Sequence, residues 1–410
     1  YGFFTYIGES EVQYGDIILG ITFCAAILNI GYLKKNPKLT RNCFYLFFIV
    51  GIGILILRFN PAGVTTINFN SSWDLYLRGV EGEMTYVSFS MQSILMYVRV
   101  CFYIIILLVA KSLLNIINWI QVLKFLTAAA KGVIIFGIFE IFIKYIQGYD
   151  LNEFLQIVFG RGLATGGDAT RLQGLSREPA NYALSLFNII ILLIVNIKLR
   201  IKSNEMIIWL VIVLLIGLNA SAFSFYLVIL SGVAIALGVF STASGKINIR
   251  RFGIIFIICI SVLIIFGLFS LSWNSYFLNR FSIALTQISY AFSSTYIIGV
   301  DFASGASRLI GIFESFRSYS ARPILGLGIG TTYCLSGIIS ILANIGLLGF
   351  IIWVRVLTVH YFKLNLLLTI SLLLPILLTN DLSSLYDTAY IVIIPLLFIA
   401  INGLPENYTD

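Results

Sequence analysis

Three charged residues in one short stretch could bind an anion and accept a proton. Arg171 and Arg177 lie close together, Glu178 follows directly, and Pro179 suits the first turn of a helix. Because the positive end of that helix and two guanidinium groups would meet at one point, the stretch predicts a phosphate-binding or carboxylate-binding site. Glu178 is a candidate general base for a hydroxyl group there. The alternative is that Glu178 only caps the helix and pairs with Arg177.

A second set of arginines follows in the next long polar segment. Arg308 and Arg317 are nine residues apart, so on one helix they would lie on opposite faces and only one could face a shared cleft. Glu314 lies three residues before Arg317 and is placed to pair with it. We therefore favour Arg308 as the arginine that acts on a substrate, and Arg322 follows as a further cation.

Metal chemistry is not expected from this sequence. It holds one histidine, His360, and five cysteines without paired spacing, which do not make a zinc site. The polar segments that follow the apolar runs lack clustered carboxylates of the kind that bind magnesium or manganese. We predict no metal and no cofactor.

The elements that position these residues must be membrane helices. The 410 residues are 59% hydrophobic and 11% charged, with a mean hydropathy of +0.99, whereas soluble domains are about 25% charged. The sequence predicts an all-α polytopic membrane protein, a single bundle over residues 1–410 with about eleven spans. The predicted spans are 14–33, 43–57, 91–110, 126–146, 180–197, 206–221, 223–240, 252–270, 333–354, 364–379 and 388–403.

Charge predicts the orientation of these spans. With the N-terminus outside, the inner segments collect 15 Lys or Arg against 3 Asp or Glu, which is the positive-inside pattern. The net charge of +8 is therefore a topogenic signal and gives no indication of nucleic-acid binding. Of the 11 outer basic residues, 10 are Arg, which binds phosphate bidentately where Lys does not. The alternative role of these arginines is ordinary pairing with outer acids.

The long outer segments are predicted to carry the chemistry. Residues 147–179 and 271–332 are the extracytoplasmic loops that hold the arginines, and apolar stripes within them predict short helices on the membrane surface. Within the bilayer, Arg99 and Glu140 are expected at similar depth on neighbouring spans, where they would form an ion pair.

Two motifs in these loops resemble those of the bacterial O-antigen polymerase and ligase family, over roughly residues 165–350. The first motif is Arg171-x-x-Gly174 followed by Glu178-Pro179-x-x-x-x-Ala183. The second motif comprises Ser304-Gly-Ala-Ser-Arg308, Arg322-Pro323-Ile-Leu-Gly326-Leu-Gly328-Ile-Gly330 and Leu342-Ala-Asn-Ile-Gly346-Leu-Leu-Gly349. The resemblance implies a fold similar to type C glycosyltransferases and a polyprenyl-pyrophosphate sugar as donor.

The resemblance also implies roles for single residues. Arg171 and Arg308 would contact pyrophosphate or hold the cleft, as catalytic residues together with Glu178. Family ligases carry a catalytic histidine about eleven residues before the Gly-x-x-Gly pair, and this chain has Leu335 there, which favours a polymerase. The same hypothesis assigns substrate binding to five residues: Arg177, Arg317, Arg322, Tyr182 and Tyr319.

The resulting hypothesis is a metal-independent glycan polymerase in the bacterial inner membrane, with its active site facing the periplasm or the cell exterior. It would transfer a growing O-antigen or capsule-type glycan from undecaprenyl pyrophosphate to an incoming lipid-linked repeat unit. Donor and acceptor are both undecaprenyl-pyrophosphate-linked oligosaccharides, and membrane lipids, a chain-length regulator and a flippase are the further partners expected. The alternatives are a ligase-type glycan transferase and a flippase for lipid-linked oligosaccharides.

Overall fold

The structure is a computed structural model, and its described residues fall into ranges separated along the chain. They are 3–7, 10–30, 37–60, 63–67, 84–113, 118–142, 172, 179–220, 232–233, 235–236, 238–239, 316–331, 337–357, 366–373 and 389–402. The predicted span at 252–270 therefore lies outside the described residues, and only parts of 223–240 are included.

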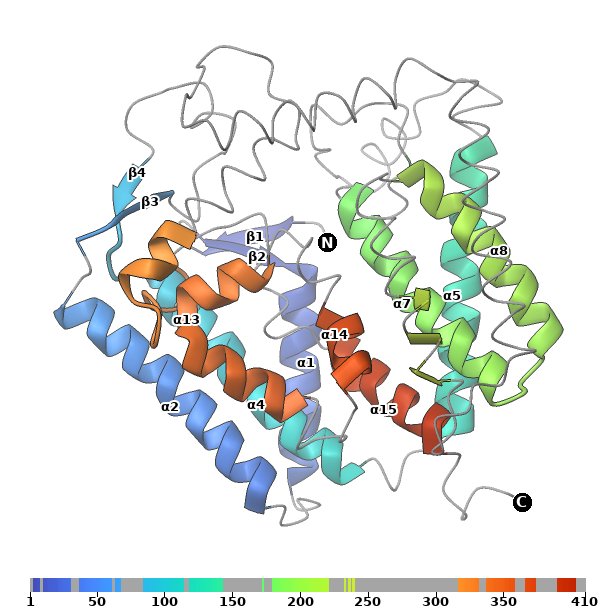
Figure 1. Ribbon diagram of the computed structural model, residues 1–410, viewed down its shortest axis with the longest axis horizontal. Coiled ribbons are helices and arrows are strands. Elements are labelled where there is room, and N and C mark those ends of the chain that lie inside the picture. The colour runs from blue at the N-terminus through green and yellow to red at the C-terminus, as the bar shows by residue number, and fades with distance from the viewer. Residues whose placement is uncertain are drawn as a thin grey trace.

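Helices dominate this part of the chain, as predicted (Figure 1). They are α1 (Tyr14–Leu28), α2 (Pro37–Phe59), α4 (Met91–Leu113), α5 (Trp119–Ile141), α7 (Pro179–Lys198), α8 (Ser203–Ala220), α13 (Gly337–Val354), α14 (Leu366–Leu373) and α15 (Ala389–Asn402). Two antiparallel hairpins are additions to the predicted fold. They are formed by β1 (Phe3–Ile7) with β2 (Ser10–Gln13), and by β3 (Thr65–Ile67) with β4 (Met84–Tyr86).

Within the described part of the chain, four helices are long and apolar enough to cross a membrane: Pro37–Phe59, Met91–Ala110, Trp119–Ile141 and Gly337–Leu357. The apolar helices Ser185–Lys198 and Ser203–Gly217 are shorter. On α2, the buried face carries Leu46 and Leu57, while large apolar residues such as Phe44, Phe48 and Leu55 remain exposed on its other faces. A helix that is apolar all round suits a lipid environment rather than water.

Two helices begin earlier than the apolar runs suggested. α2 starts at Pro37 rather than at residue 43, and α5 starts at Trp119 rather than at residue 126. The side chain of Asn118 accepts a hydrogen bond from the backbone nitrogen of Gln121 at 3.2 Å and so caps α5. Both helices thus extend beyond the hydrophobic core of the bilayer, where Lys and Arg side chains are tolerated.

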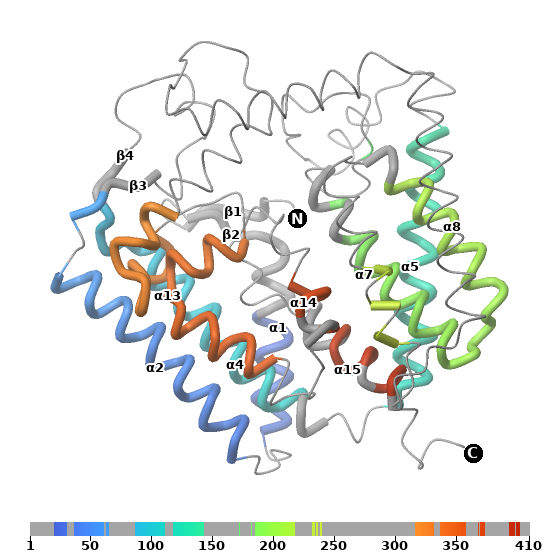
Figure 2. Tube along the Cα trace, viewed as in Figure 1, coloured from blue at the N-terminus to red at the C-terminus, as the bar shows by residue number. Residues whose placement is uncertain are grey.

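The helices pack in two groups, which lie on the left and right of Figure 1 and can be followed as tubes in Figure 2. On the left, α4 contacts α1 and α2, and α2 contacts α13; on the right, α7 contacts α5, α8 and α15. Arg99 lies on α4 and Glu140 on α5, and the predicted ion pair between them stays a prediction. Arg99 donates from Nη1 to Met96 Sδ, 3.5 Å away on its own helix.

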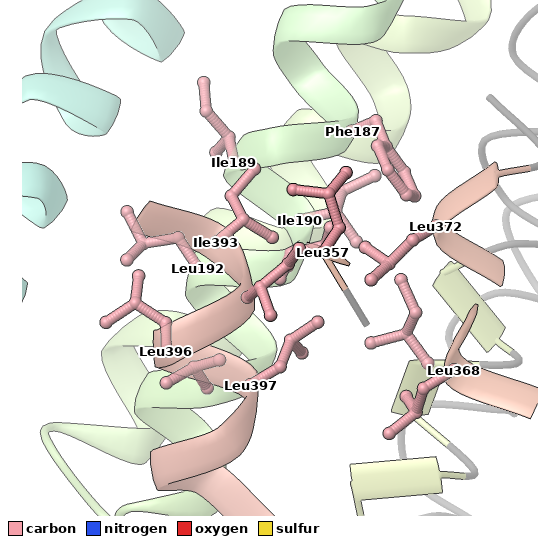
Figure 3. Close-up of a cluster of buried hydrophobic side chains, with 14 of the residues drawn as sticks. Phe187, Ile189, Ile190, Leu192, Leu357, Leu368, Leu372, Ile393, Leu396 and Leu397 are labelled. Atoms are coloured by element: carbon pink, nitrogen blue, oxygen red, sulfur yellow. The ribbon is translucent and has the colours of Figure 1, made fainter. Parts of the chain in front are cut away.

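The core of the right-hand group joins elements that are distant in sequence. Figure 3 shows Ile189 of α7 beside Ile393 of α15, with Leu396 below them, and Phe187 of α7 on the side of Leu372 of α14. All five side chains are buried. This packing holds α7, and with it the residues that follow the first motif, against the C-terminal part of the chain.

Candidate functional site

Two parts of the second motif, Arg322–Gly330 and Leu342–Gly349, form one structural unit around a break in α13. Gly346 has φ 70° and ψ 176°, which is not helical, and interrupts the helix in its middle. In a regular helix, the carbonyls of Ala343 and Asn344 would accept from the backbone nitrogens of Leu347 and Leu348. At the break, these four backbone groups need other partners, because an unsatisfied polar group in an apolar environment is costly.

Residues 323–328 provide all four partners. The backbone nitrogens of Leu327 and Gly328 donate to the carbonyls of Ala343 and Asn344, at 2.8 and 3.1 Å. In return, the nitrogens of Leu347 and Leu348 donate to the carbonyls of Pro323 and Ile324, at 2.9 and 3.1 Å. Two parts of the second motif, residues 323–328 and 343–348, therefore exchange backbone hydrogen bonds. The earlier segment provides the partners for these four backbone groups at the break in the helix.

Glycine is required where the two segments meet. Gly326 and Gly346 have positive φ, and a Cβ atom at Gly326 would lie 2.6 Å from the backbone of Asn344. Gly328 and Gly330 also have positive φ. At these two positions an added Cβ would approach Leu57 of α2 and Ser93 of α4 to 3.1 Å, so the segment also packs against the left-hand group.

Asn344 fixes the far end of this segment. Its Oδ1 accepts from the backbone nitrogen of Thr331 at 3.1 Å, and its Nδ2 donates to the carbonyl of Ser340 at 2.7 Å. The hydroxyl of Thr331 donates to the carbonyl of Gly328 at 2.7 Å. Asn344 is 1% exposed. The sequence interpretation did not single it out, although a polar side chain within an apolar helix signals a specific hydrogen-bonding role.

Arg322 lies at the start of this unit and beside the last turn of α2. Its Nη2 donates to the carbonyl of Asn60, which follows the end of α2. Its Nη1 is buried and has no hydrogen-bond partner among the described residues. Next to it is a groove of about 590 Å³ that is almost entirely apolar. The groove is lined by Leu55, Ile56, Phe59, Asn60, Arg322, Pro323, Ile324 and Leu325.

Two more predicted substrate-binding residues precede Arg322 on the same segment. Residues 316–321 are helical; Arg317 is exposed, and Tyr319 is partly exposed beside the ring of Phe316, 5.8 Å away. Ser320 donates to the carbonyl of Arg317 at 2.8 Å. One short segment therefore carries Arg317, Tyr319 and Arg322, which are also close to each other in the sequence.

Tyr182 lies elsewhere, on α7 in the right-hand group. The side chain of Tyr182 is 1% exposed, and its hydroxyl has no hydrogen-bond partner among the described residues. The hydroxyl fits against Gly137 of α5, where a Cβ atom added to the glycine would overlap the hydroxyl oxygen. Glu140, one turn further along α5, is fully buried and within electrostatic range of Tyr182. The structure therefore places Tyr182 in a helix interface, apart from Arg317, Tyr319 and Arg322.

The catalytic residues predicted from the sequence lie outside the described residues. These are Glu178, Arg171 and Arg308, and the substrate-binding candidate Arg177 and the acid Glu314 lie outside them too. Two neighbours are described: Pro179 begins α7, as predicted for the first turn of a helix, and Leu172 is fully buried in the main hydrophobic cluster. Within the described ranges, no three His, Cys, Asp or Glu residues are grouped so that they could hold a metal ion.

No protein-family model, curated protein or solved structure matches this chain. The resemblance carried by the two motifs therefore remains a prediction. The structural support for a functional site comes from the geometry around Gly346 and Arg322.

Proposed function

We propose that this chain is a membrane glycan polymerase that uses lipid-linked sugars on the outer face of the bacterial inner membrane. The observation that carries the proposal is the pairing of residues 322–328 with the break in α13, because two separate parts of the second motif are brought into one unit. That unit lies at the predicted outer end of α2 and holds Arg322 beside an apolar groove.

The proposed reaction transfers a glycan from its undecaprenyl-pyrophosphate carrier to an incoming lipid-linked repeat unit. A hydroxyl oxygen of the acceptor attacks the anomeric carbon of the donor, and the bond from that carbon to the pyrophosphate oxygen breaks. Glu178 takes the hydroxyl proton, and the pyrophosphate leaves with the bonding electrons. Arg171, Arg177 and Arg308 stabilise its negative charge, and the chain needs no metal for this step.

The full proposal includes about eleven spans, a fold similar to type C glycosyltransferases, and a flippase and a chain-length regulator as partners. A ligase-type transferase that uses a base other than histidine is the nearest alternative. The four helices that could cross a membrane are compatible with each of these enzymes.

A transporter for lipid-linked oligosaccharides is the second candidate, and the break in α13 favours it. Transporters commonly use interrupted helices with unwound backbone at the substrate site. In this chain, the carbonyls of Ala343 and Asn344 and the nitrogens of Leu347 and Leu348 are paired with residues 323–328, which leaves these four groups unable to coordinate a substrate. For this reason we rank the transporter below the polymerase.

The test is a reconstitution of the purified chain in liposomes with a lipid-linked repeat unit and no flippase. Wild-type protein should produce a ladder of longer glycans. Glu178→Gln should fold and reduce chain growth by about 10²–10⁴-fold, as expected for loss of a general base. Lys124→Ala, which changes an exposed residue of α5, is the matched control and should keep full activity. Movement of the repeat unit across the bilayer without elongation would identify a transporter instead.

A further inference from the structure

The groove beside Arg322 has the chemistry of a lipid-binding site. Its lining is apolar, and Leu55, Phe59 and Ile324 expose much of their side chains there, with Phe59 81% exposed. These residues belong to the last turns of α2 and to the turn that follows Arg322. α2 is apolar on all faces and is long enough to cross a membrane, so its exposed side faces hydrocarbon rather than water.

The guanidinium of Arg322 supplies positive charge at the edge of this apolar groove. Nη2 donates to the carbonyl of Asn60, whereas Nη1 is buried and has no hydrogen-bond partner among the described residues. A buried N–H group that carries positive charge is strongly stabilised by an anionic acceptor. Arg58, in the last turn of α2, adds a second positive charge at the same end of the helix, where it lies 5.6 Å from the ring centre of Phe89.

We propose that this groove binds a phospholipid of the surrounding bilayer. One acyl chain would lie along Leu55, Phe59 and Ile324, and the phosphate would lie against the positively charged guanidinium of Arg322. A soluble phosphate ion would gain the charge interaction but none of the apolar contact, so the groove favours an anion with a hydrocarbon chain. The site stands independently of the polymerase activity, because it needs only the described residues of α2 and of the 322–325 turn.

The experiment measures lipid retention by native mass spectrometry of the purified full chain, using phosphatidylglycerol as the probe. Wild type should retain one phosphatidylglycerol molecule more tightly than diacylglycerol with the same chains, since the latter lacks the phosphate. Arg322→Gln loses the charge and is too short to reach the carbonyl of Asn60. It should remain folded in lipid-free detergent, as its melting temperature there would show, and retain phosphatidylglycerol about tenfold less well.

Two further variants test the location of the site. Phe59→Ala should weaken retention of both lipids, because it removes apolar lining. Arg317→Ala, which removes an exposed arginine outside the groove lining, should retain phosphatidylglycerol as wild type does. Equal retention by wild type and Arg322→Gln would overturn the proposal, as would full competition by soluble glycerol phosphate. Preferential retention of a polyprenyl phosphate over phosphatidylglycerol would also overturn it and would assign the groove to a polyprenyl carrier.

Discussion

Gly326 and Gly346 approach each other so closely that a Cβ atom on Gly346 would lie 2.5 Å from the backbone nitrogen of Gly326. Both residues have positive φ, at 72° and 70°. The two glycines belong to segments twenty residues apart in the sequence, and their contact brings the carbonyls and nitrogens of both segments within hydrogen-bonding distance. The break in α13 and the preceding turn therefore depend on each other.

The first prediction is that Gly346→Ala disrupts this unit. The new methyl group would meet the backbone of the facing segment, and the left-handed conformation is unfavourable for alanine, so we expect a loss of more than about 2 kcal/mol. Thermal unfolding in detergent, followed by size-exclusion chromatography, would measure it. Gly132→Ala is the control, because Gly132 is exposed within α5 with nothing within 4 Å. That variant should be neutral or gain up to about 1 kcal/mol, and an equal loss in both variants would contradict the proposed role of Gly346.

The second prediction concerns the buried amide of Asn344. Asn344→Leu removes the acceptor for the backbone nitrogen of Thr331 and the donor to the carbonyl of Ser340, and should cost about 1–3 kcal/mol. Ser340→Ala is the matched control one turn away. The Ser340 hydroxyl is buried and has no hydrogen-bond partner among the described residues, so its removal should change the melting temperature little. A similar loss for both variants would show that volume, rather than the hydrogen bonds of Asn344, determines stability here.

These residues also show how far sequence reasoning reached. Runs of apolar residues predicted the positions of α1, α4, α7 and α13, since membrane helices are specified by hydrophobicity along a single segment. The backbone exchange around Gly346 was not predicted, because it depends on the conformation of two separate segments. Composition alone does not reveal which carbonyls a glycine leaves without partners.

The choice of neighbouring helices is a second limit, and the Arg99–Glu140 pair stays a prediction. Depth along a helix can be counted from the sequence, but the neighbours of that helix are decided by packing between distant segments. Here α4 packs with α1 and α2, while α5 packs with α7 and α8. Three of the eight candidate site residues lie on one described segment because they are close in the sequence: Arg317, Tyr319 and Arg322. Tyr182 shared only an assumed role with them, and the structure places it in another interface.

The third prediction concerns an ion pair that joins α5 to α8 near the predicted inner surface. Lys131 contacts Glu205, which also lies 3.6 Å from Lys202 and accepts from Trp209 Nε1 at 3.4 Å. Because the pair is partly exposed, a double-mutant cycle with Lys131→Met and Glu205→Gln should give a small favourable coupling that falls at high salt. Lys124→Met, on the exposed face of α5, should show no coupling to Glu205→Gln. Coupling of equal size for Lys124 would point to a general charge effect.

The fourth prediction separates a packing role of Tyr182 from a role in substrate binding. The Tyr182 hydroxyl occupies the space beside Gly137, so Gly137→Ala should force α5 and α7 apart and cost about 1–3 kcal/mol. The Tyr182→Phe variant lacks a buried hydroxyl that has no hydrogen-bond partner among the described residues. Its stability should therefore be unchanged or slightly higher. In the double variant, the lost hydroxyl would leave room for the new methyl group, and part of the stability should return. Recovery should be incomplete, because the same methyl group would also lie 3.2 Å from two carbon atoms of Ile216.

Melting temperatures of the four proteins in this cycle give the coupling between Tyr182 and Gly137, and additive effects would show that the two residues do not meet. Glycan elongation by the folded Tyr182→Phe variant then decides the role of the side chain. Normal chain growth assigns Tyr182 to helix packing, because the hydroxyl is the one group that the variant lacks. Loss of elongation with unchanged stability would instead assign that hydroxyl to the substrate.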